Sequence, residues 1–378
     1  MKKQLLIMLL NTIIIFGCVG ICLNVLPLVK TQAAAASISL VSIASPEHRK
    51  KPEISSDKSK TTEQTTNTRT DEQVMNVIGS KDSDDGYDIT ETPPDVKALM
   101  QKAKGKYTKK NVSGKTSEGA YTGGGTIISH GIVQIQSKIP ASFYKPDIKS
   151  LLREGAELKI KDKNKPTILI YHSHTHEAYS LVDSGYYISS DSSSSDNAKN
   201  VVRVGDELAS TLEKAGFKVI HDTEVHDNEY NNSYSNSRKT VEKYLEKYPS
   251  IDITIDLHRD DITYQNKTKV KPTAVVGGKK AARMMIISGC EYGSVQNFPD
   301  WEYNLRFNVD IMNKVNGMYK DLMRPILFSE RRYNMFETHT SFLLEIGTDA
   351  NTLDEACYSA RLFGTAFADL LDEKYVTK

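Results

Sequence analysis

The sequence predicts an α/β protein whose folded part is a mostly parallel, twisted sheet with helices on both faces. Short β-prone runs alternate with segments of helical period through the C-terminal two thirds of the chain, as in strand-helix-strand units. Before them lie a long apolar segment without charge and a long polar stretch. We therefore expect three parts: a cytoplasmic N-terminus and transmembrane helix over residues 1–30, a disordered linker over 31–122 and a folded domain over 123–378.

The first part begins with Lys2 and Lys3 and continues as an uncharged apolar segment over residues 4–29. A membrane-spanning helix needs about 20 apolar residues, whereas the apolar core of a signal peptide has about 7 to 15. The length favours an uncleaved single-pass anchor, and cleavage at the small residues 33–36 is the alternative. The two lysines keep the N-terminus in the cytoplasm by the positive-inside rule, so we expect the rest of the chain outside the cytoplasm.

The second part is rich in Ser, Thr, Lys, Asp, Glu and Gln and shows no sustained apolar period. Such a segment cannot bury enough apolar surface to offset the entropy lost on ordering, so we expect a disordered extracytoplasmic tether. Only residues 95–104, which follow Pro93 and Pro94, have the pattern of a short helix, and we expect that helix to be transient. A flexible tether would let an anchored domain reach away from the membrane.

The folded domain alternates strand and helix patterns. Apolar residues recur at helical spacing between Val201 and Leu212, which predicts a helix that ends at Gly216. Runs rich in β-branched residues predict the strands, and Pro249 ends a second helix. The expected order is strand 168–171, helix 197–215, strand 217–220, helix 241–248, strand 251–257, strand 283–288, helix 303–322, strand 326–328, strand 341–346 and helix 353–371.

The first of these strands leads directly into three histidines and a glutamate. Neutral imidazole and carboxylate are common zinc ligands, and a catalytic zinc often takes three protein ligands and leaves a position for water. His174 and Glu177 have the spacing His-x-x-Glu, which is short enough for one turn to direct both side chains to one point. We expect these two to bind metal, although each histidine of the set is a candidate. The set is His172, His174, His176 and Glu177.

Two other predicted strands carry matching chemistry. The run 251–257 ends at His258, which we expect to be the third metal ligand. Glu345 lies inside an apolar run, where a carboxylate is costly unless it has a partner. A metal-bound water is such a partner, so Glu345 is expected to act as general base. The carboxyl ends of parallel strands meet at one edge of a sheet, and this convergence carries more weight than any single histidine.

Several segments, in this order, resemble the stage II sporulation protein P family over about residues 123–378. The resemblance implies a zinc-dependent cell-wall hydrolase with an amidase-like fold, active on peptidoglycan as N-acetylmuramoyl-L-alanine amidase and endopeptidase during engulfment of the forespore. It implies His174, Glu177 and His258 as zinc ligands and Glu345 as the residue that activates water. It also implies stage II sporulation proteins D and M as partners, and a location between the mother-cell and forespore membranes. The segments are 170–179, 199–208, 256–260, 332–334, 343–347 and 351–356.

Three neighbours of these residues are expected to support the site. Asp256 lies two residues before the third ligand and is placed to orient it as a hydrogen-bond acceptor. Arg259 is expected to hold a peptide carboxylate, or else to pair with Asp260 or Asp261. His172 shares a strand face with His174 by alternation, so we expect it to face the substrate or to support the ligands.

Other features point to no site. His221 and His226 flank a loop and are expected to be exposed. Cys290 and Cys357 are the only cysteines beyond the apolar segment and form no Cys-x-x-Cys motif, so the predicted metal site contains only histidine and carboxylate. A net charge of +1 without a basic stripe argues against nucleic acid as a partner.

Two alternative functions stay open at this stage. A metallocarboxypeptidase acting on cell-wall peptides also uses His-x-x-Glu, a distant histidine and a glutamate base, but it needs a pocket for a terminal carboxylate. A non-catalytic wall-binding scaffold could keep the fold without the chemistry. The joint presence of the ligand set and Glu345 argues against a scaffold, because a binding module has no need of a buried general base.

Overall fold

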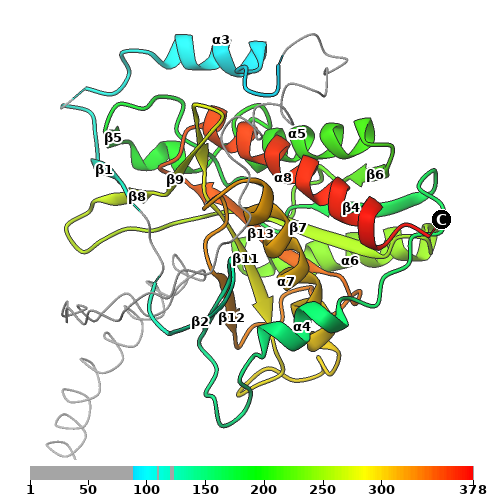
Figure 1. The fold of residues 1–378 in the computed structure, drawn as a ribbon. Helices are drawn as coiled ribbons and strands as arrows, with labels where there is room; N and C mark the ends of the chain where they lie inside the picture. Colours follow the sequence, from blue (N-terminus) through cyan, green and yellow to red (C-terminus); the bar gives the residue numbers. More distant parts are fainter. Residues whose placement is uncertain (1–87, 109, 120–122, 378) are drawn as a thin grey trace, which may run out of the picture. The chain divides into compact units, whose positions relative to one another are not determined.

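The computed structural model describes residues 88–108, 110–119 and 123–377 (Figure 1). The predicted membrane anchor and most of the predicted linker lie outside these residues. Among the described residues, no helix combines the length and the apolar character needed to cross a bilayer.

The described domain is built on one large sheet, and parallel pairing predominates in it, as the sequence predicts (Figure 1). The pairs β2/β3 and β11/β13 are antiparallel, whereas the other neighbours run parallel. The strand order is β2 (Thr126–His130), β3 (Val133–Ser137), β12 (Ile326–Ser329), β11 (Met284–Gly289), β13 (Phe342–Thr348), β7 (Ile253–Asp260), β4 (Pro166–Tyr171) and β6 (Lys218–His221).

Helices cover both faces of this sheet, but unequally. Ile168 and Ile170 of β4 belong to the main hydrophobic core, which α5 and α8 complete, whereas Leu169 and Tyr171 point the other way and pack with Val241 of α6. Among the described residues, four helices of the predicted domain contribute to the main core, to which the helix Pro94–Ala103 adds Val96, and one helix packs on the opposite face. The first four are α4 (Ile148–Glu154), α5 (Val201–Lys214), α7 (Trp301–Met318) and α8 (Leu353–Lys374), and the last is α6 (Ser233–Lys247).

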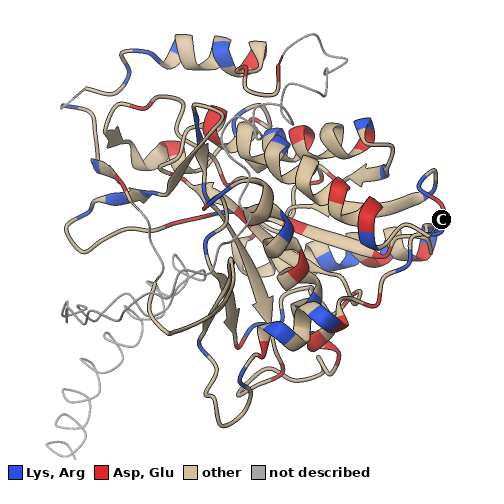
Figure 2. Cartoon of the chain, viewed as in Figure 1, with Lys and Arg blue, Asp and Glu red and all other residues tan. Residues whose placement is uncertain are grey.

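Local capping fixes where the two central helices begin. The side chain of Asn200 accepts a hydrogen bond from the Val202 backbone N–H at 2.9 Å, which starts α5. Thr352 and Glu355 form a capping box at the start of α8. Both basic and acidic residues occur along these helices (Figure 2), in line with the small net charge.

Short strands form two smaller sheets beside the large one. One contains β5, β1 and β8 in that order, and the other is a hairpin of β9 and β10. Two short 3-10 helices cover Ser189–Ser192 and Tyr230–Asn232. The strands are β1 (Gly114–Glu118), β5 (Tyr186–Tyr187), β8 (Lys269–Lys271), β9 (Thr273–Val276) and β10 (Lys279–Ala282).

Residues 88–119, which the sequence assigns to the linker, are part of this packing. Helix α3 (Pro94–Ala103) buries Val96 completely, and the Asp95 carboxylate lies 2.6 Å from Nε of Arg203 on α5. Strand β1 pairs with β5 and β8. The described residues 88–108 and 110–119 therefore pack with the domain that the sequence places from Gly123 onward, because a few specific contacts order a segment whose composition is polar.

Candidate metal centre

Two neighbouring strands bring His258 and Glu345 together. In the β7/β13 pair these two residues lie directly opposite each other, so their side chains share one face of the sheet. Alternation along β7 puts Asp256 on that same face, while Ile255 and Leu257 point into the main core. The site therefore occupies the face that α6 covers only in part.

The turn after β4 supplies the next side chain, His174. Asp256 holds this turn, because its carboxylate accepts hydrogen bonds from the Ser173 backbone N–H at 2.8 Å and the Ser173 hydroxyl at 2.6 Å. The ring centroids of His174 and His258 are 5.3 Å apart. His174 is 4% exposed, and neither of its buried ring nitrogens has a hydrogen-bond partner. Burial lowers the pKa of His174, which favours the neutral imidazole that metals bind.

The other two histidines of the turn face elsewhere. His172 is fully buried, with Nδ1 2.9 Å from the Leu257 carbonyl oxygen and Nε2 2.9 Å from Nε2 of His221. Burial lowers the pKa of His172 to about 3, and the charge of the neighbouring His221 acts in the same direction. His176 pairs with Asp227, whose carboxylate is 2.9 Å from Nδ1. In this turn, His174 is therefore the histidine whose nitrogens are unpaired and next to His258.

Glu177 lies beside His258 of β7 and completes the predicted ligand set. Its Oε2 lies 3.2 Å from Nδ1 of His258 and accepts a hydrogen bond from the Arg259 backbone N–H at 3.0 Å. Burial opposes ionisation of Glu177, but the charges of Arg259 and His258 outweigh it and hold the pKa down at about 2. Glu177 is thus an ionised carboxylate at the place where the two histidines meet.

Arg259 supports Glu177 and does not present a free guanidinium. Its Nε donates to the Ala178 carbonyl at 3.3 Å and its Nη2 to the Ser192 carbonyl at 2.8 Å, and its Nη1 lies 3.7 Å from Glu177. The predicted alternative, a pair with Asp260 or Asp261, is not what the structure has. Those two carboxylates pair with Arg324 and Lys269 respectively.

His258 and Glu345 are both buried at this edge. His258 Nε2 lies 2.8 Å from Asp256 Oδ1, so carboxylates flank both ring nitrogens. Burial alone would lower the pKa of His258, but Asp256 and Glu177 raise it well above its usual range. Burial raises the pKa of Glu345, and the negative charge of Asp260 raises it further. The Oε2 atom of Glu345 has no hydrogen-bond partner. Three carboxylates converge on this imidazole, which makes the site attractive to a cation.

The side-chain types of this set are those that bind zinc in proteins. His174 offers unpaired imidazole nitrogens, His258 a second imidazole and Glu177 an ionised carboxylate, which are the ligand types that zinc takes in proteins. Unpaired polar atoms of this kind are costly inside a protein unless another group completes them. Glu345 lies directly across from His258 in the β7/β13 pair.

Aromatic residues line this site, and no pattern in the sequence predicts them. Tyr230 stacks on the His174 ring with centroids 4.4 Å apart, and Tyr234 stacks between His258 and Tyr333. They come from the loop before α6, the first turn of α6 and the loop after β12, and only tertiary structure brings such segments together. The polar segment around residue 230 shows no helical or strand periodicity that would identify these aromatic residues.

Two histidines that we expected to be exposed are packed beside the turn. His226 is 2% exposed, and its Nδ1 lies 3.0 Å from the His172 carbonyl oxygen. His221 is half-buried between His172 and Asp206. The prediction of exposed polar residues is wrong for His226, because the partners that bury it are distant in sequence.

Comparison with solved structures finds amidases of low similarity, including the following three. N-acetylmuramoyl-L-alanine amidase AmiC2 of Nostoc punctiforme is 10% identical and covers 56% of this chain and 97% of its own, with a TM-score of 0.31. The CwlD amidase from Clostridioides difficile, solved with the GerS lipoprotein, is 11% identical over 55% and 100%, with a TM-score of 0.32. The amidase Ami1 from Mycobacterium abscessus is 12% identical over 55% and 99%, also at 0.32. Likeness at this level transfers no activity to this chain.

Comparison with protein families gives a direct result. No curated protein sequence matches the chain. The family model described as stage II sporulation protein P matches residues 24–368, which includes both strands of the candidate site and the turn with His174. Since this match spans most of the 378 residues, the chain belongs to the stage II sporulation protein P family.

Proposed function

We propose that this chain is a zinc-dependent peptidoglycan hydrolase that acts in sporulation as an N-acetylmuramoyl-L-alanine amidase and as an endopeptidase. Membership of the stage II sporulation protein P family supports a role in the sporulating cell wall. The observation that carries the proposal is His174, which is buried with two unpaired ring nitrogens beside Glu177 and His258. A buried imidazole without partners is best explained by a ligand that completes it.

The proposed chemistry divides the work among four side chains. His174, Glu177 and His258 would hold the ion. When bound, zinc lowers the pKa of a water molecule and polarises a carbonyl oxygen, which favours attack on an amide. Glu345 accepts the proton of the attacking water and returns it to the leaving amine nitrogen. Burial raises the pKa of Glu345, which makes its carboxylate a stronger base for the first of these steps.

Neighbouring residues keep this set in position. Asp256 lies against Nε2 of His258, which leaves Nδ1 facing Glu177 as the ligand atom. Through Ser173 the same carboxylate fixes the turn that carries His174. Arg259 holds Glu177 from the other side. Orientation of all the ligands therefore depends on contacts already present within the chain.

The engaged guanidinium of Arg259 argues against a carboxypeptidase. Its Nε and Nη2 donate to backbone carbonyls, so it offers no open fork to a terminal carboxylate. A non-catalytic scaffold is disfavoured by Glu345, because an unpaired buried carboxylate serves no binding surface. An internal amide of the wall is therefore the bond class that we favour.

We place this domain outside the cytoplasm, in the space between the mother-cell and forespore membranes, on a single-pass anchor within residues 4–29. The uncharged apolar segment and the preceding lysines support this location. Peptidoglycan is then the substrate that the domain meets, and stage II sporulation proteins D and M are the partners that we propose from the family.

The test uses the full-length chain in detergent, incubated with purified peptidoglycan with zinc or with a chelator, and identifies released fragments by mass. Wild type should release stem peptides and cut cross-links only when zinc is present. Glu345→Gln should bind the same amount of zinc but lose about 100- to 10,000-fold in rate, because the general base is gone. Glu246→Gln, the same change at an exposed position of α6, should act like wild type.

The outcome can also contradict the proposal. If the zinc-loaded wild type leaves the wall intact, the scaffold interpretation replaces the hydrolase. If Glu345→Gln retains full activity, the reaction uses another base. Fragments cut only at cross-links would remove the amidase and leave the endopeptidase.

A further inference from the structure

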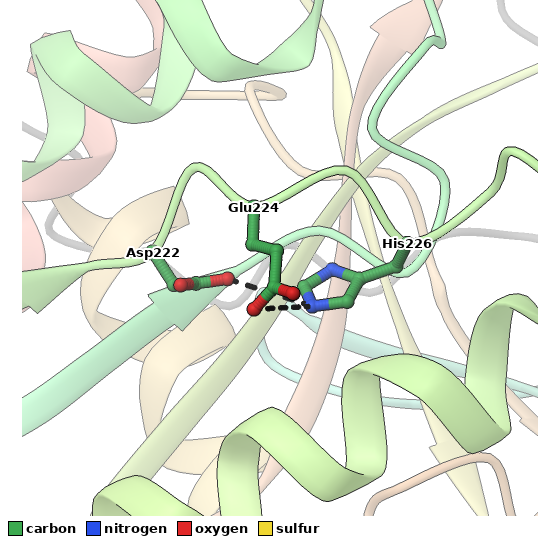
Figure 3. Close-up of side chains that lie close together, drawn as sticks. All are labelled: Asp222, Glu224 and His226. Atoms are coloured by element: carbon green, nitrogen blue, oxygen red, sulfur yellow. Dashed lines mark ion pairs between the residues drawn. The ribbon is translucent and has the colours of Figure 1, made fainter.

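A second group of metal-type ligands lies on the loop that follows β6. Asp222, Glu224 and His226 turn their side chains toward one another there (Figure 3). Nε2 of His226 is 3.7 Å from Asp222 Oδ2 and 4.0 Å from Glu224 Oε2, and the three ligand atoms all lie within 4.8 Å of one another. None of these residues belongs to the site at His174.

The spacing of the three residues explains why they converge. They occupy every second position of an extended segment, and alternate side chains of such a segment point to one side. The residues between them, Thr223 and Val225, are exposed on the other side. Three side chains from one short segment can therefore reach a common point.

One buried oxygen in this group has no partner. Asp222 is 6% exposed, and its Oδ2, the atom that faces His226, makes no hydrogen bond. Its other oxygen accepts a hydrogen bond from the Tyr244 hydroxyl at 3.4 Å. A carboxylate oxygen taken from water without a partner is costly, so this position calls for a positive group.

The surroundings of His226 prepare one nitrogen for a ligand. Nδ1 lies 3.0 Å from the His172 carbonyl oxygen, which can only accept, so the ring proton belongs on Nδ1. In the neutral ring Nε2 is then the nitrogen with a lone pair. It faces the two carboxylates and the Thr240 hydroxyl, which itself donates to Glu224 Oε2 at 3.1 Å. A backbone carbonyl that fixes the tautomer in this way is the usual support of a metal-binding histidine.

The distances suit a small ion after a modest closure. Ligand atoms about 2.0–2.1 Å from a zinc ion lie roughly 3.3 Å apart in a tetrahedron. Glu224 is largely exposed, so its side chain can move toward the other two. An imidazole nitrogen selects transition metals over calcium and magnesium, which take oxygen ligands.

We propose that Asp222, Glu224 and His226 bind a divalent transition-metal ion at a second site, separate from the one at His174. The ion would tie the 222–226 loop to the turn that carries His174. That turn already contacts the loop, since the Thr175 hydroxyl accepts from the His226 backbone N–H at 3.2 Å and lies 3.1 Å from the Glu224 carbonyl oxygen. The role of the second ion is therefore to hold the turn in place, whatever reaction the chain performs.

A proton on His226 is the competing occupant, because an imidazolium would also pair with Asp222. The experiment separates the two with Zn²⁺ as the probe. The full-length chain in detergent is stripped with a chelator and dialysed against Zn²⁺, and bound zinc per chain is measured by elemental analysis. His174→Ala removes a ligand of the first site and leaves the second untouched.

Wild type should bind two zinc ions, and His174→Ala should keep the second. In the His174→Ala background, Glu224→Gln should weaken the remaining affinity by at least about 10-fold, because a charged ligand is lost. Glu229→Gln, the same change at an exposed position of the same loop, should leave it unchanged. Since Glu224 is exposed, its variant should fold, and equal thermal midpoints of the two variants without metal check this.

The inference is overturned if His174→Ala binds no zinc, or if Glu224→Gln and Glu229→Gln bind it equally. A wild type with one zinc that His174→Ala abolishes would leave the proposed function intact and remove the second site. If wild type binds one zinc, and that zinc survives in His174→Ala but is weakened by Glu224→Gln, the second site stands and the proposed zinc site at His174 is removed. The two proposals therefore fail separately.

Discussion

The two faces of β7 are both buried, yet they carry different chemistry. On one face, Ile255 and Leu257 are fully buried in the main core beneath α5 and α8. On the other, Asp256 and His258 are buried to almost the same degree among carboxylates and tyrosines. Burial stabilises the first face through the hydrophobic effect. On the second face it costs free energy, which hydrogen bonds and ion pairs have to offset.

Strand β13 repeats this division one strand away. Leu344 points into the main core, and its neighbour Glu345 points into the site. A single step along either strand thus separates a residue that holds the fold from one that we assign to chemistry. The comparison predicts that substitutions on the core face lower the free energy of unfolding, whereas substitutions on the site face lower zinc binding.

The largest effect on stability is expected from Leu257→Ala. The side chain is completely buried, so its truncation should lower the free energy of unfolding by about 2–5 kcal/mol. Zinc bound per folded chain should stay the same, because the removed atoms face away from the site. Urea unfolding with a chelator present measures the first quantity, and zinc titration under native conditions measures the second.

His258→Ala, one position along, is the matched change for this comparison and should abolish zinc binding at the first site. Loss of that zinc from folded Leu257→Ala would show that the two faces are not independent. In that case the strand would have to be treated as one unit, in which core packing sets the ligand geometry.

A smaller effect is expected from Asp256→Asn. This carboxylate contacts His258 Nε2 and holds Ser173, so its loss should reduce zinc affinity about 10- to 100-fold, as is usual for outer partners of a ligand. Ser173→Ala removes only the hydroxyl contact and should cost less. Equal losses in the two variants would indicate that Asp256 acts through the turn alone and not through His258. Zinc titration against a competing chelator measures both.

The sequence predicts the main strands because their runs are long, apolar and β-branched. The same runs locate the candidate site, since His174, Glu177, His258 and Glu345 each lie at or near the end of one, and the structure brings all four together. Strand β2, in contrast, has mostly exposed residues, so no apolar pattern marks it in the sequence. The roles of His174, Glu177, His258 and Glu345 in metal binding and catalysis stay proposals.

What the sequence does not predict depends on distant partners. Helix α3 is held by buried Val96 and by the contact of Asp95 with Arg203, 108 positions away. The segment before α3 is held by Arg361, which donates to the Ile89 carbonyl 272 positions away. Composition alone reveals neither contact. His226 is buried by α6 and the turn after β4. The sequence assigns Arg259 to a substrate or a neighbouring aspartate, but its donors bind backbone carbonyls 81 and 67 positions away in the chain.

The smallest effect is expected from His176→Ala, two residues after the predicted ligand His174. His176 pairs with Asp227 at 2.9 Å near the surface, and such a pair contributes less than about 1 kcal/mol. His176→Ala should therefore lower the free energy of unfolding only slightly and leave bound zinc unchanged, while the backbone N–H of residue 176 keeps its bond to Asp227. Urea unfolding and zinc titration, run beside His174→Ala, make the comparison. Loss of the first-site zinc in His176→Ala and its retention in His174→Ala would reverse the assignment, because the two histidines have distinct partners and only one of them has free nitrogens beside His258.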